Sequence, residues 1–383
     1  MCAQQHIDIH RCADTLAALI DVDGTSVTTD VVSGRPTSLS TLDRFLPVWI
    51  LLAMAAGLVL GRLWPGVADV LDGAKIGSVS LPIAVGLLVM MYPVLAKVRY
   101  DQSRHVLGDK RLLGASIALN WVVGPALMFA LAWLLLPDLP ELRTGLIIVG
   151  LARCIAMVLI WNDLACGDRE AAAVLVAVNS VFQVVAFGAL GWFYLQILPA
   201  WLGLSTTSAE FSVVTITVSV LVFLGVPLVA GYATRTLGER RWGREAYEAR
   251  FLPRIGPWAL YGLLFTIVVL FALQGDAITS RPLDVLRVAV PLLIYFFAMF
   301  GIGMAAGRLL SLGYERSATL AFTAAGNNFE LAIAVAIGTF GVTSGQALAG
   351  VIGPLVEVPV LVALVYVALR LRPSFMPSER SVR

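Results

Sequence analysis

The chain has 383 residues, of which 59% are hydrophobic and 14% are charged, and its mean hydropathy is +0.87. A soluble globular domain has about 45–50% apolar and about 25% charged residues, so this composition excludes one large soluble domain and indicates an integral membrane protein. The formal net charge of +2 gives no support to a nucleic-acid partner.

Ten apolar windows along the chain are long enough to cross a bilayer as helices. A spanning helix needs about 20 mostly apolar residues, because the hydrocarbon core is about 30 Å thick and each residue adds about 1.5 Å. The windows lie near residues 45–63, 77–96, 112–136, 143–161, 171–198, 211–234, 256–274, 285–309, 317–340 and 347–370. We expect residues 1–44 to form a polar, disordered cytoplasmic leader and residues 371–383 to form a cytoplasmic tail, since neither segment contains such a window.

The distribution of Lys and Arg predicts the orientation. Of the 27 basic residues, 21 fall in the two tails and the even-numbered loops, five fall in the odd-numbered loops, and Arg153 lies inside the fourth window. Cytoplasmic loops carry the excess of Lys and Arg in membrane proteins. Both termini are therefore expected on the cytoplasmic side of the plasma (inner) membrane.

The ten windows divide into two sets of five, residues 45–198 and 199–370. Because five is odd, the second set must run across the membrane in the opposite direction, which is the inverted repeat common among secondary transporters. The segment from Arg153 to Met157 aligns with Phe329 to Ile333 at an offset of 176 residues, and windows five and ten begin at the same offset. The predicted fold is all-α, with ten transmembrane helices in two inverted five-helix repeats.

Polar residues inside apolar windows mark candidate functional sites. An ionisable group at mid-bilayer costs at least about 2.5 kcal/mol, so it points to a cavity, a relay or a ligand site. The residues of this kind are Arg153 and Cys154 in helix 4, Glu330 in helix 9, Glu357 in helix 10, Asn120 in helix 3, and Asn179 and Gln183 in helix 5.

The sequence Gly326-Asn327-Asn328 inside helix 9 is a poor helix former and predicts a local break. Irregular backbone is tolerated at membrane depth where it lines a cavity. Interrupted helices at matching positions of two repeats are where transporters bind substrate. We therefore expect helices 4 and 9 to be discontinuous and to meet at one site.

Each candidate also has a structural reading. A lone cysteine such as Cys154 is commonly a small buried hydrophobe, and Asn120 and Asn179 can serve only as helix–helix contacts. Arg153 can pair structurally with Glu330 or Glu357. Glu330 is the hardest to explain structurally, because glutamates at this depth are rare.

The leader contains weak candidates for a metal or metalloid site, namely Cys2, His6, His10 and Cys12. These side chains are suitable ligands for soft metals, but their spacing is not that of a closed structural zinc site. The alternative is a polar leader without a ligand. We expect no resident metal and no cofactor elsewhere in the chain.

Three contiguous motifs resemble those of a known family. The segments Leu151–Asp163, Asn327–Ile337 and Gly353–Pro359 look like the signatures of the arsenical-resistance permeases. These permeases are the arsenite-efflux branch of the bile acid/arsenite/riboflavin transporter superfamily. The similarity extends from about Leu39 to Arg370.

The resemblance implies a secondary transporter, not an enzyme, that exports As(III) in exchange for protons, with antimonite left open as a second substrate. This sequence departs from the family's pattern at Gly326, where relatives can carry Ser. Oligomeric state is not readable from the sequence. The resemblance and the motifs assign substrate binding to Cys154, Arg153, Asn328, Asn327, Asn179 and Asn120, and proton coupling to Glu330 and Glu357.

Two alternatives remain from the sequence. The nearer is a sodium-coupled symporter for an organic anion of the bile-acid type, from the same superfamily, which would not need a central cysteine. The other is an intramembrane enzyme or sensor, which would need a paired catalytic constellation such as two aspartates or His-Glu-x-x-His in the helices. The windows contain no such pattern.

Overall fold

The computed structural model describes residues 46–64, 66, 75–76, 79–98, 108–155, 157–205 and 213–375. The predicted leader, with its candidate ligands Cys2, His6, His10 and Cys12, lies outside the described residues. So does the predicted tail beyond Phe375.

The described residues are almost entirely helical. In the first half of the chain the elements are α3 (Leu46–Leu63), β1 (Lys75–Ile76), β2 (Val79–Ser80), α5 (Leu81–Ala96), α7 (Lys110–Ala118), η1 (Leu119–Val123), α8 (Gly124–Leu135), α9 (Pro140–Leu151), α10 (Met157–Leu164), α11 (Arg169–Trp192), η2 (Phe193–Ile197) and α12 (Leu198–Trp201). In the second half they are α13 (Val213–Val220), η3 (Leu221–Gly225), α14 (Val226–Trp242), α15 (Arg244–Ala246), η4 (Tyr247–Phe251), α16 (Leu252–Ser280), α17 (Pro282–Leu309), α18 (Gly313–Ala325), α19 (Phe329–Phe340), α20 (Gly345–Leu371) and η5 (Arg372–Phe375). The short antiparallel pair β1–β2 joins α3 to α5.

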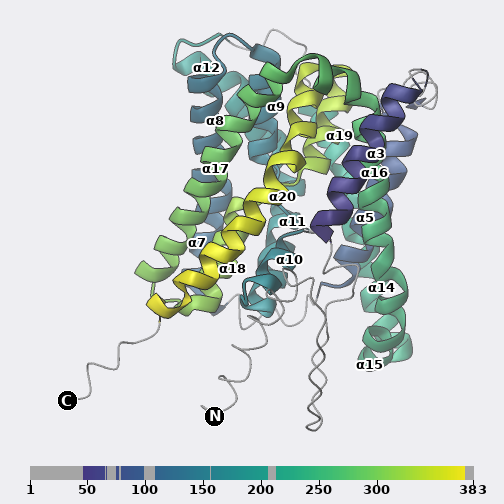
Figure 1. Cartoon of the computed structure of the whole chain (residues 1–383). Helices are drawn as coiled ribbons and strands as arrows, with labels where there is room; N and C mark the ends of the chain where they lie inside the picture. The colour runs from purple at the N-terminus through teal and green to yellow at the C-terminus, as the bar shows by residue number, and fades with distance from the viewer. Residues whose placement is uncertain are drawn as a thin grey trace, which may run out of the picture.

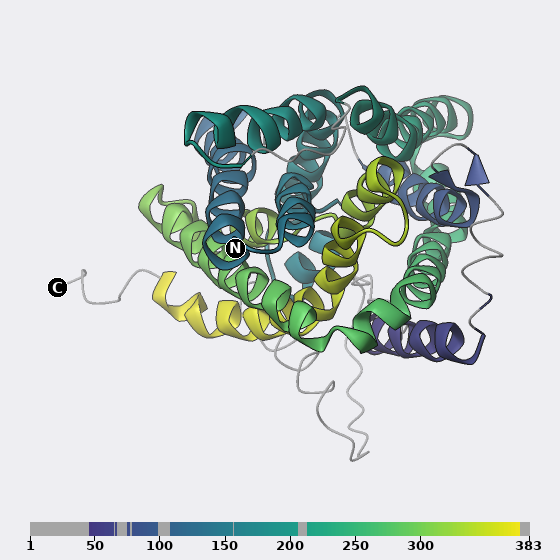
Figure 2. The ribbon, with the colours of Figure 1, turned by 90° about the horizontal axis from the view of Figure 1, so that it is seen from above.

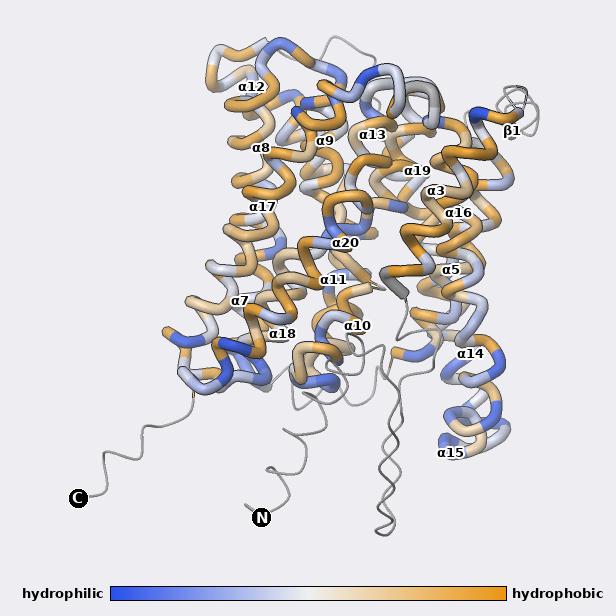
Figure 3. Tube along the Cα trace, in the orientation of Figure 1, coloured by the Kyte–Doolittle hydropathy of each residue, from blue (hydrophilic) through white to orange (hydrophobic). Residues whose placement is uncertain are grey.

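Helix occupies most of the described part of each window predicted from the sequence, which confirms the all-α membrane class. Six helical stretches in the described chain are long and apolar enough to cross a membrane, and α3, α5 and α19 are shorter apolar helices. Figure 3 shows apolar residues along the middle of the bundle and hydrophilic residues gathered towards the helix ends. The arrangement of the spans as two inverted repeats remains a prediction.

Within the described residues, four helical stretches contain a π-helical turn, and each turn is followed by a proline. The turns η1, η2, η3 and η4 precede Pro125, Pro199, Pro227 and Pro253, each at the second residue of the next α-helix. A proline inside an α-helix lacks an N–H donor and clashes with the carbonyl one turn earlier. The wider π turn accommodates that carbonyl, so the helix continues across the proline.

The helices form two groups (Figures 1 and 2). One group contains α3, α5, α14 and α16, and the other contains the helices from α7 to α12 together with α17, α18 and α20. Gly57 and Gly61 of α3 lie against α16, where an added Cβ would clash with the backbone carbonyl oxygens of Val268 and Ala272. This Gly-x-x-x-Gly spacing lets two helices pack closely without bulky side chains.

Helix 4 and helix 9 of the sequence prediction are both interrupted. In the first, residues 152–155 lie between α9 and α10 without being helical, and the second is split into α18 and α19 by Gly326–Asn328. Gly326 has extended backbone angles, and Asn328 caps α19 by accepting the N–H of Leu331 at 3.0 Å. The predicted discontinuity of both helices is confirmed.

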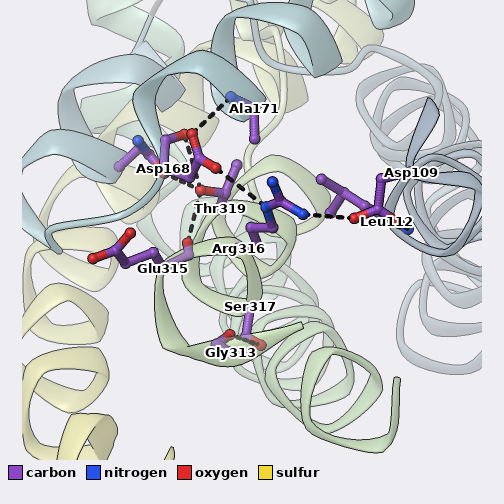
Figure 4. Close-up of polar contacts among 10 residues, drawn as sticks. Asp109, Leu112, Asp168, Ala171, Gly313, Glu315, Arg316, Ser317 and Thr319 are labelled. Atoms are coloured by element: carbon purple, nitrogen blue, oxygen red, sulfur yellow. Dashed lines mark hydrogen bonds and ion pairs between the residues drawn. The ribbon is translucent and has the colours of Figure 1, made fainter. Parts of the chain in front are cut away.

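An ion-pair cluster joins the N-termini of three helices (Figure 4). Arg316 of α18 donates from Nη1 to Asp109 at 2.8 Å and from Nε to Asp168 at 3.3 Å. Asp109 and Asp168 are the N-cap residues of α7 and α11, where they accept backbone N–H groups. The cluster therefore fixes the start of α18 to the starts of α7 and α11.

Candidate functional site

The two interruptions cross each other inside the helix bundle. Arg153 and Asn327 form an isolated antiparallel bridge, in which the N–H of Cys154 donates to Gly326 O at 3.3 Å and the N–H of Asn328 donates to Ala152 O at 3.0 Å. We call residues 152–155 the first crossing segment and residues 326–328 the second crossing segment. Each segment supplies backbone partners that the other lost when its helix was interrupted.

Cys154 lies in the first crossing segment, directly before α10. It is a free cysteine and only 3% exposed. Its Sγ is within hydrogen-bonding range of the backbone N–H groups of Met157 and Val158, at the N-terminus of α10. These N–H groups belong to the first turn of α10, where a helix has no carbonyl of its own to accept them.

Arg153, the neighbour of Cys154, is fully buried. Its Nη1 donates to the hydroxyl of Tyr295 on α17 at 2.7 Å and to Ala324 O at 3.5 Å. Its Nε and Nη2 have no hydrogen-bond partner in the described part of the chain. A buried cation needs partners for its donors, so these two nitrogens are available to a ligand or to water.

The two glutamates lie close to the second crossing segment. Glu330 is half-buried in the first turn of α19, and Glu357 is 1% exposed on α20. Glu357 Oε1 accepts the N–H of Asn327 at 3.2 Å. Both carboxyl groups interact electrostatically with Cys154 and with each other. A thiol and two carboxyl groups thus share one buried region.

The asparagines of the second crossing segment also carry unused hydrogen-bonding groups. Asn327 and Asn328 are each 2% exposed. Neither the amide nitrogen nor the carbonyl oxygen of the Asn327 side chain has a partner among the described residues, and the same holds for Nδ2 of Asn328. Buried polar groups in folded proteins are nearly always satisfied, so these atoms are candidates for contacts with a polar ligand or with water.

Asn120 and Asn179 each lie four residues before a residue that adjoins Arg153, namely Gly124 and Gln183. Asn120, on η1, donates to Ser116 O at 2.9 Å, and Asn179, on α11, accepts from Trp121 Nε1 at 3.2 Å. Both residues are buried, and each keeps one amide atom without a partner in the residues described. No direct contact between either asparagine and Cys154 is present among the described hydrogen bonds.

Three further residues complete the surroundings of Arg153. The Tyr295 hydroxyl accepts a hydrogen bond from the guanidinium, and Gln183 Oε1 accepts one from the backbone N–H of Arg153. Gly124 leaves room beside the guanidinium. The sequence interpretation named Gln183 only as a polar residue in helix 5 and did not identify Tyr295. Tyrosine is common in cores and at interfaces, so its presence in an apolar helix does not mark a site. The one feature of the sequence that could have singled out Tyr295 is its position one turn after Pro291.

Interrupted helices whose broken ends meet among buried polar groups, inside an apolar bundle, define a membrane transporter. Comparison with known proteins agrees with this class. Residues 84–281 match the model of the Sodium Bile acid symporter family. The chain is 64% identical to the arsenical-resistance protein Acr3 of Corynebacterium glutamicum, over 90% of this chain and 93% of that protein.

Two more distant relatives cover nearly the same length. An uncharacterized transporter of Synechocystis is 36% identical, over 86% of this chain and 88% of that protein. The arsenical-resistance protein Acr3 of Alkaliphilus metalliredigens is 32% identical, over 87% of this chain and 94% of that protein. The chain therefore belongs to the arsenical-resistance permeases within the Sodium Bile acid symporter family. The family resemblance read from the three sequence motifs is confirmed, and with it the class of multi-pass membrane transporter rather than enzyme.

Proposed function

We propose that this chain is an arsenite efflux permease that exchanges As(III) for protons. The observation that carries the proposal is the buried Cys154 thiol, which lies at the N-terminus of α10 and within electrostatic range of Glu330 and Glu357. The two relatives named as arsenical-resistance proteins support the substrate.

The chemistry of As(III) suits a single thiol. At neutral pH arsenite is a small, largely uncharged trihydroxide, As(OH)₃. The sulfur of Cys154 would form one S–As bond while one As–OH bond breaks, and the hydroxide would leave as water with the thiol proton. A single S–As bond is reversible by hydrolysis, whereas three would hold the metalloid too tightly for release.

The polar groups around Cys154 would bind the remaining hydroxyl groups of the substrate. The unused donors are Nε and Nη2 of Arg153 and the side-chain amides of Asn327 and Asn328, and Asn120 and Asn179 are the outlying candidates. These groups are polar, and the Arg153 guanidinium among them is positively charged, which suits a small oxygen-rich solute. A bulky amphipathic acid would need an apolar cavity in addition.

Proton coupling is assigned to Glu330 and Glu357. Both side chains lie among apolar helices, and carboxyl groups in such surroundings take part in proton relays. Because both interact electrostatically with Cys154, a proton on either carboxyl group changes the charge near the bound metalloid. We infer that protonation and As(III) binding compete, so that one occupant travels out and the other in.

The same proposal includes two inverted repeats, residues 45–198 and 199–370, with both termini in the cytoplasm. The crossing supports it, because the reciprocal bonds around Arg153 and Asn327 relate two antiparallel segments as a local two-fold axis would. The bridge pairs residues 174 positions apart, two fewer than the offset of the sequence alignment. The excess of Lys and Arg in the tails and even-numbered loops supports the orientation in the plasma (inner) membrane.

Everted vesicles from a host without its own arsenite exporter test the function. We expect As(III) uptake that depends on an imposed pH gradient, is lost in Cys154→Ser and loses its pH dependence in Glu330→Gln. Native uptake by Cys154→Ser would refute the role of the thiol. Uptake of a bile-acid-type anion driven by a sodium gradient, with no As(III) uptake, would support the sodium-coupled alternative that the family name suggests. Antimonite is measured in parallel as a second substrate.

A further inference from the structure

Gln183 in the first half of the chain occupies the position that Glu357 occupies in the second. Gln183 Oε1 accepts the backbone N–H of Arg153, and Glu357 Oε1 accepts the backbone N–H of Asn327. In both cases the acceptor follows its donor by 30 residues. The two donors are the residues paired in the antiparallel bridge. Each crossing segment is therefore attached to a helix of its own half by one side-chain oxygen.

The backbone of the first crossing segment depends on this attachment. The N–H of Ala152 donates to Val149 O and that of Cys154 donates to Gly326 O. The N–H of Arg153, between them, donates to Gln183. No water competes for such a group in an apolar interior, so an N–H without a protein acceptor there is costly.

Gln183 itself is fully buried on α11, and its Nε2 has no hydrogen-bond partner among the residues described. A glutamine kept at such a position without a full set of partners is unfavourable for packing alone. The use that the structure makes of it is the single bond from Oε1 to the segment that carries Arg153 and Cys154.

We propose that Gln183 is a positioning residue of the transport site, which holds the first crossing segment against α11 and thereby fixes the Cys154 thiol at the N-terminus of α10. The inference rests on the proposed function in one respect, that Cys154 is the thiol that binds As(III). Gln183 carries no charge and does not titrate, so its bond to Arg153 N–H is the same at every pH. Glu357 can take up a proton, so only the bond to Asn327 N–H changes its character with protonation. The charged and titratable groups that face the pair are the Arg153 guanidinium with the Tyr295 hydroxyl bonded to it, Cys154 and Glu330.

The test measures the position of Cys154 without arsenic. In a background where Cys2, Cys12 and Cys166 are replaced by serine, the rate of Cys154 alkylation by N-ethylmaleimide is measured in membranes. Gln183→Met keeps the length of the side chain and removes the acceptor, and we expect alkylation to become about tenfold faster as the segment detaches. Val185→Met on the same helix is the matched control, because that side chain is 79% exposed, and it should leave the rate unchanged.

A second pair of variants separates positioning from folding. Gln183→Glu keeps an acceptor oxygen at the same reach, whereas Gln183→Asn keeps the amide but is one methylene too short. We expect Gln183→Glu to restore native alkylation and Gln183→Asn to behave like Gln183→Met. Equal alkylation rates in Gln183→Glu and Gln183→Asn would overturn the proposal, as would a native rate in Gln183→Met.

As(III) uptake in everted vesicles is measured on the same variants. We expect the maximal rate of uptake to fall in Gln183→Met and Gln183→Asn and to recover in Gln183→Glu. If the native chain takes up no As(III), the proposed function fails, while the alkylation rates still report whether Gln183 positions Cys154.

Discussion

The guanidinium of Arg153 and the hydroxyl of Tyr295 form a 2.7 Å hydrogen bond between the first crossing segment and α17. The space beside this contact is left free by a glycine, Gly124. A Cβ at Gly124, the first residue of α8, would lie 2.7 Å from Arg153 Nη1 and 3.0 Å from the Tyr295 hydroxyl. The guanidinium is thus fixed in a narrow space, with Nε and Nη2 left over for a ligand.

Gly124→Ala should disturb this arrangement without adding charge or polarity. The new methyl group cannot be accommodated unless the Arg153 guanidinium moves, and overpacking of this kind typically costs about 1–3 kcal/mol. We expect As(III) uptake into everted vesicles to fall by about tenfold, because a displaced guanidinium no longer presents its free donors to the substrate.

The matched control is Gly114→Ala in α7, the helix that continues into η1 and α8. A Cβ there meets nothing within 4 Å. Alanine also has the higher helix propensity, so uptake should stay native and stability should not fall. Native uptake by Gly124→Ala would show that Arg153 does not need its observed position.

Asn328 combines two roles that substitution can separate. Its Oδ1 caps α19 by accepting the N–H of Leu331, and its Nδ2 has no partner in the described chain. Serine is as good an N-cap as asparagine, whereas alanine costs about 1 kcal/mol at such a position. We therefore expect Asn328→Ser to keep the native melting temperature in detergent and Asn328→Ala to lower it.

Transport should respond differently from stability at this position. Both substitutions remove Nδ2, so both should lower As(III) uptake if that nitrogen donates to the substrate. Native uptake by Asn328→Ser would restrict Asn328 to its capping role.

The second interruption could be predicted from the sequence, and the first could be predicted only by analogy with it. Gly326, Asn327 and Asn328 are weak helix formers, and they end α18 where expected. The segment from Ala152 to Ile155 contains neither glycine nor proline, and its residues have no local reason to leave the helix. It is extended because its partners lie in the second crossing segment and on α11, and such tertiary contacts override propensity.

The partners of Arg153 show the same limit. The structural alternative for Arg153 in the sequence interpretation was a pair with Glu330 or Glu357, because a buried cation needs an opposite charge. In the structure Arg153 bonds instead to a phenol and a backbone carbonyl, and Glu357 accepts a backbone N–H. Which of several polar residues meet depends on helix rotation, and an apolar window around the polar residue does not encode that rotation.

The loop between α8 and α9 offers a test of pH dependence outside the membrane. Asp138 accepts two hydrogen bonds from Arg287, and this bonding lowers the pKa of the Asp138 carboxyl group below its ordinary value of about 3.9. Because the folded-state pKa lies below the unfolded one, the ion pair stabilises the fold above about pH 3.9. The contribution is lost as the pH falls through the folded-state value.

Asp138→Asn lacks this contribution at every pH. We expect its melting temperature in detergent to be below that of the native chain at neutral pH, with the difference closing below about pH 4. Arg287→Gln should show the same neutral deficit and the same closure. A difference that persists undiminished in acid would assign the effect to something other than this ion pair.

The cluster at Arg316 gives a prediction about how stability is divided between a cap and an ion pair. Asp168 both caps α11, by accepting the N–H of Ala171, and accepts from Arg316. Arg316 is 42% exposed, so its two ion pairs are partly screened, and exposed pairs contribute about 0.2–1 kcal/mol each. Asp168→Ala loses the cap, at about 1 kcal/mol, and one ion pair, whereas Arg316→Gln loses two ion pairs and no cap. Asp168→Ala should therefore destabilise the protein more than Arg316→Gln, by the cost of the cap less that of the pair with Asp109.

Thermal unfolding of the two single variants and the double variant in detergent measures the division. We expect the double variant to be only slightly less stable than Asp168→Ala, because Arg316 keeps only its pair with Asp109 once Asp168 is gone. High salt should shrink the effect of Arg316→Gln and leave most of the effect of Asp168→Ala, since screening acts on the ion pairs more than on the cap. Glu315→Gln, on the same turn but with an exposed carboxylate, is the control and should be neutral. If Arg316→Gln proves as costly as Asp168→Ala, the ion pairs rather than the helix cap fix α18 to α11.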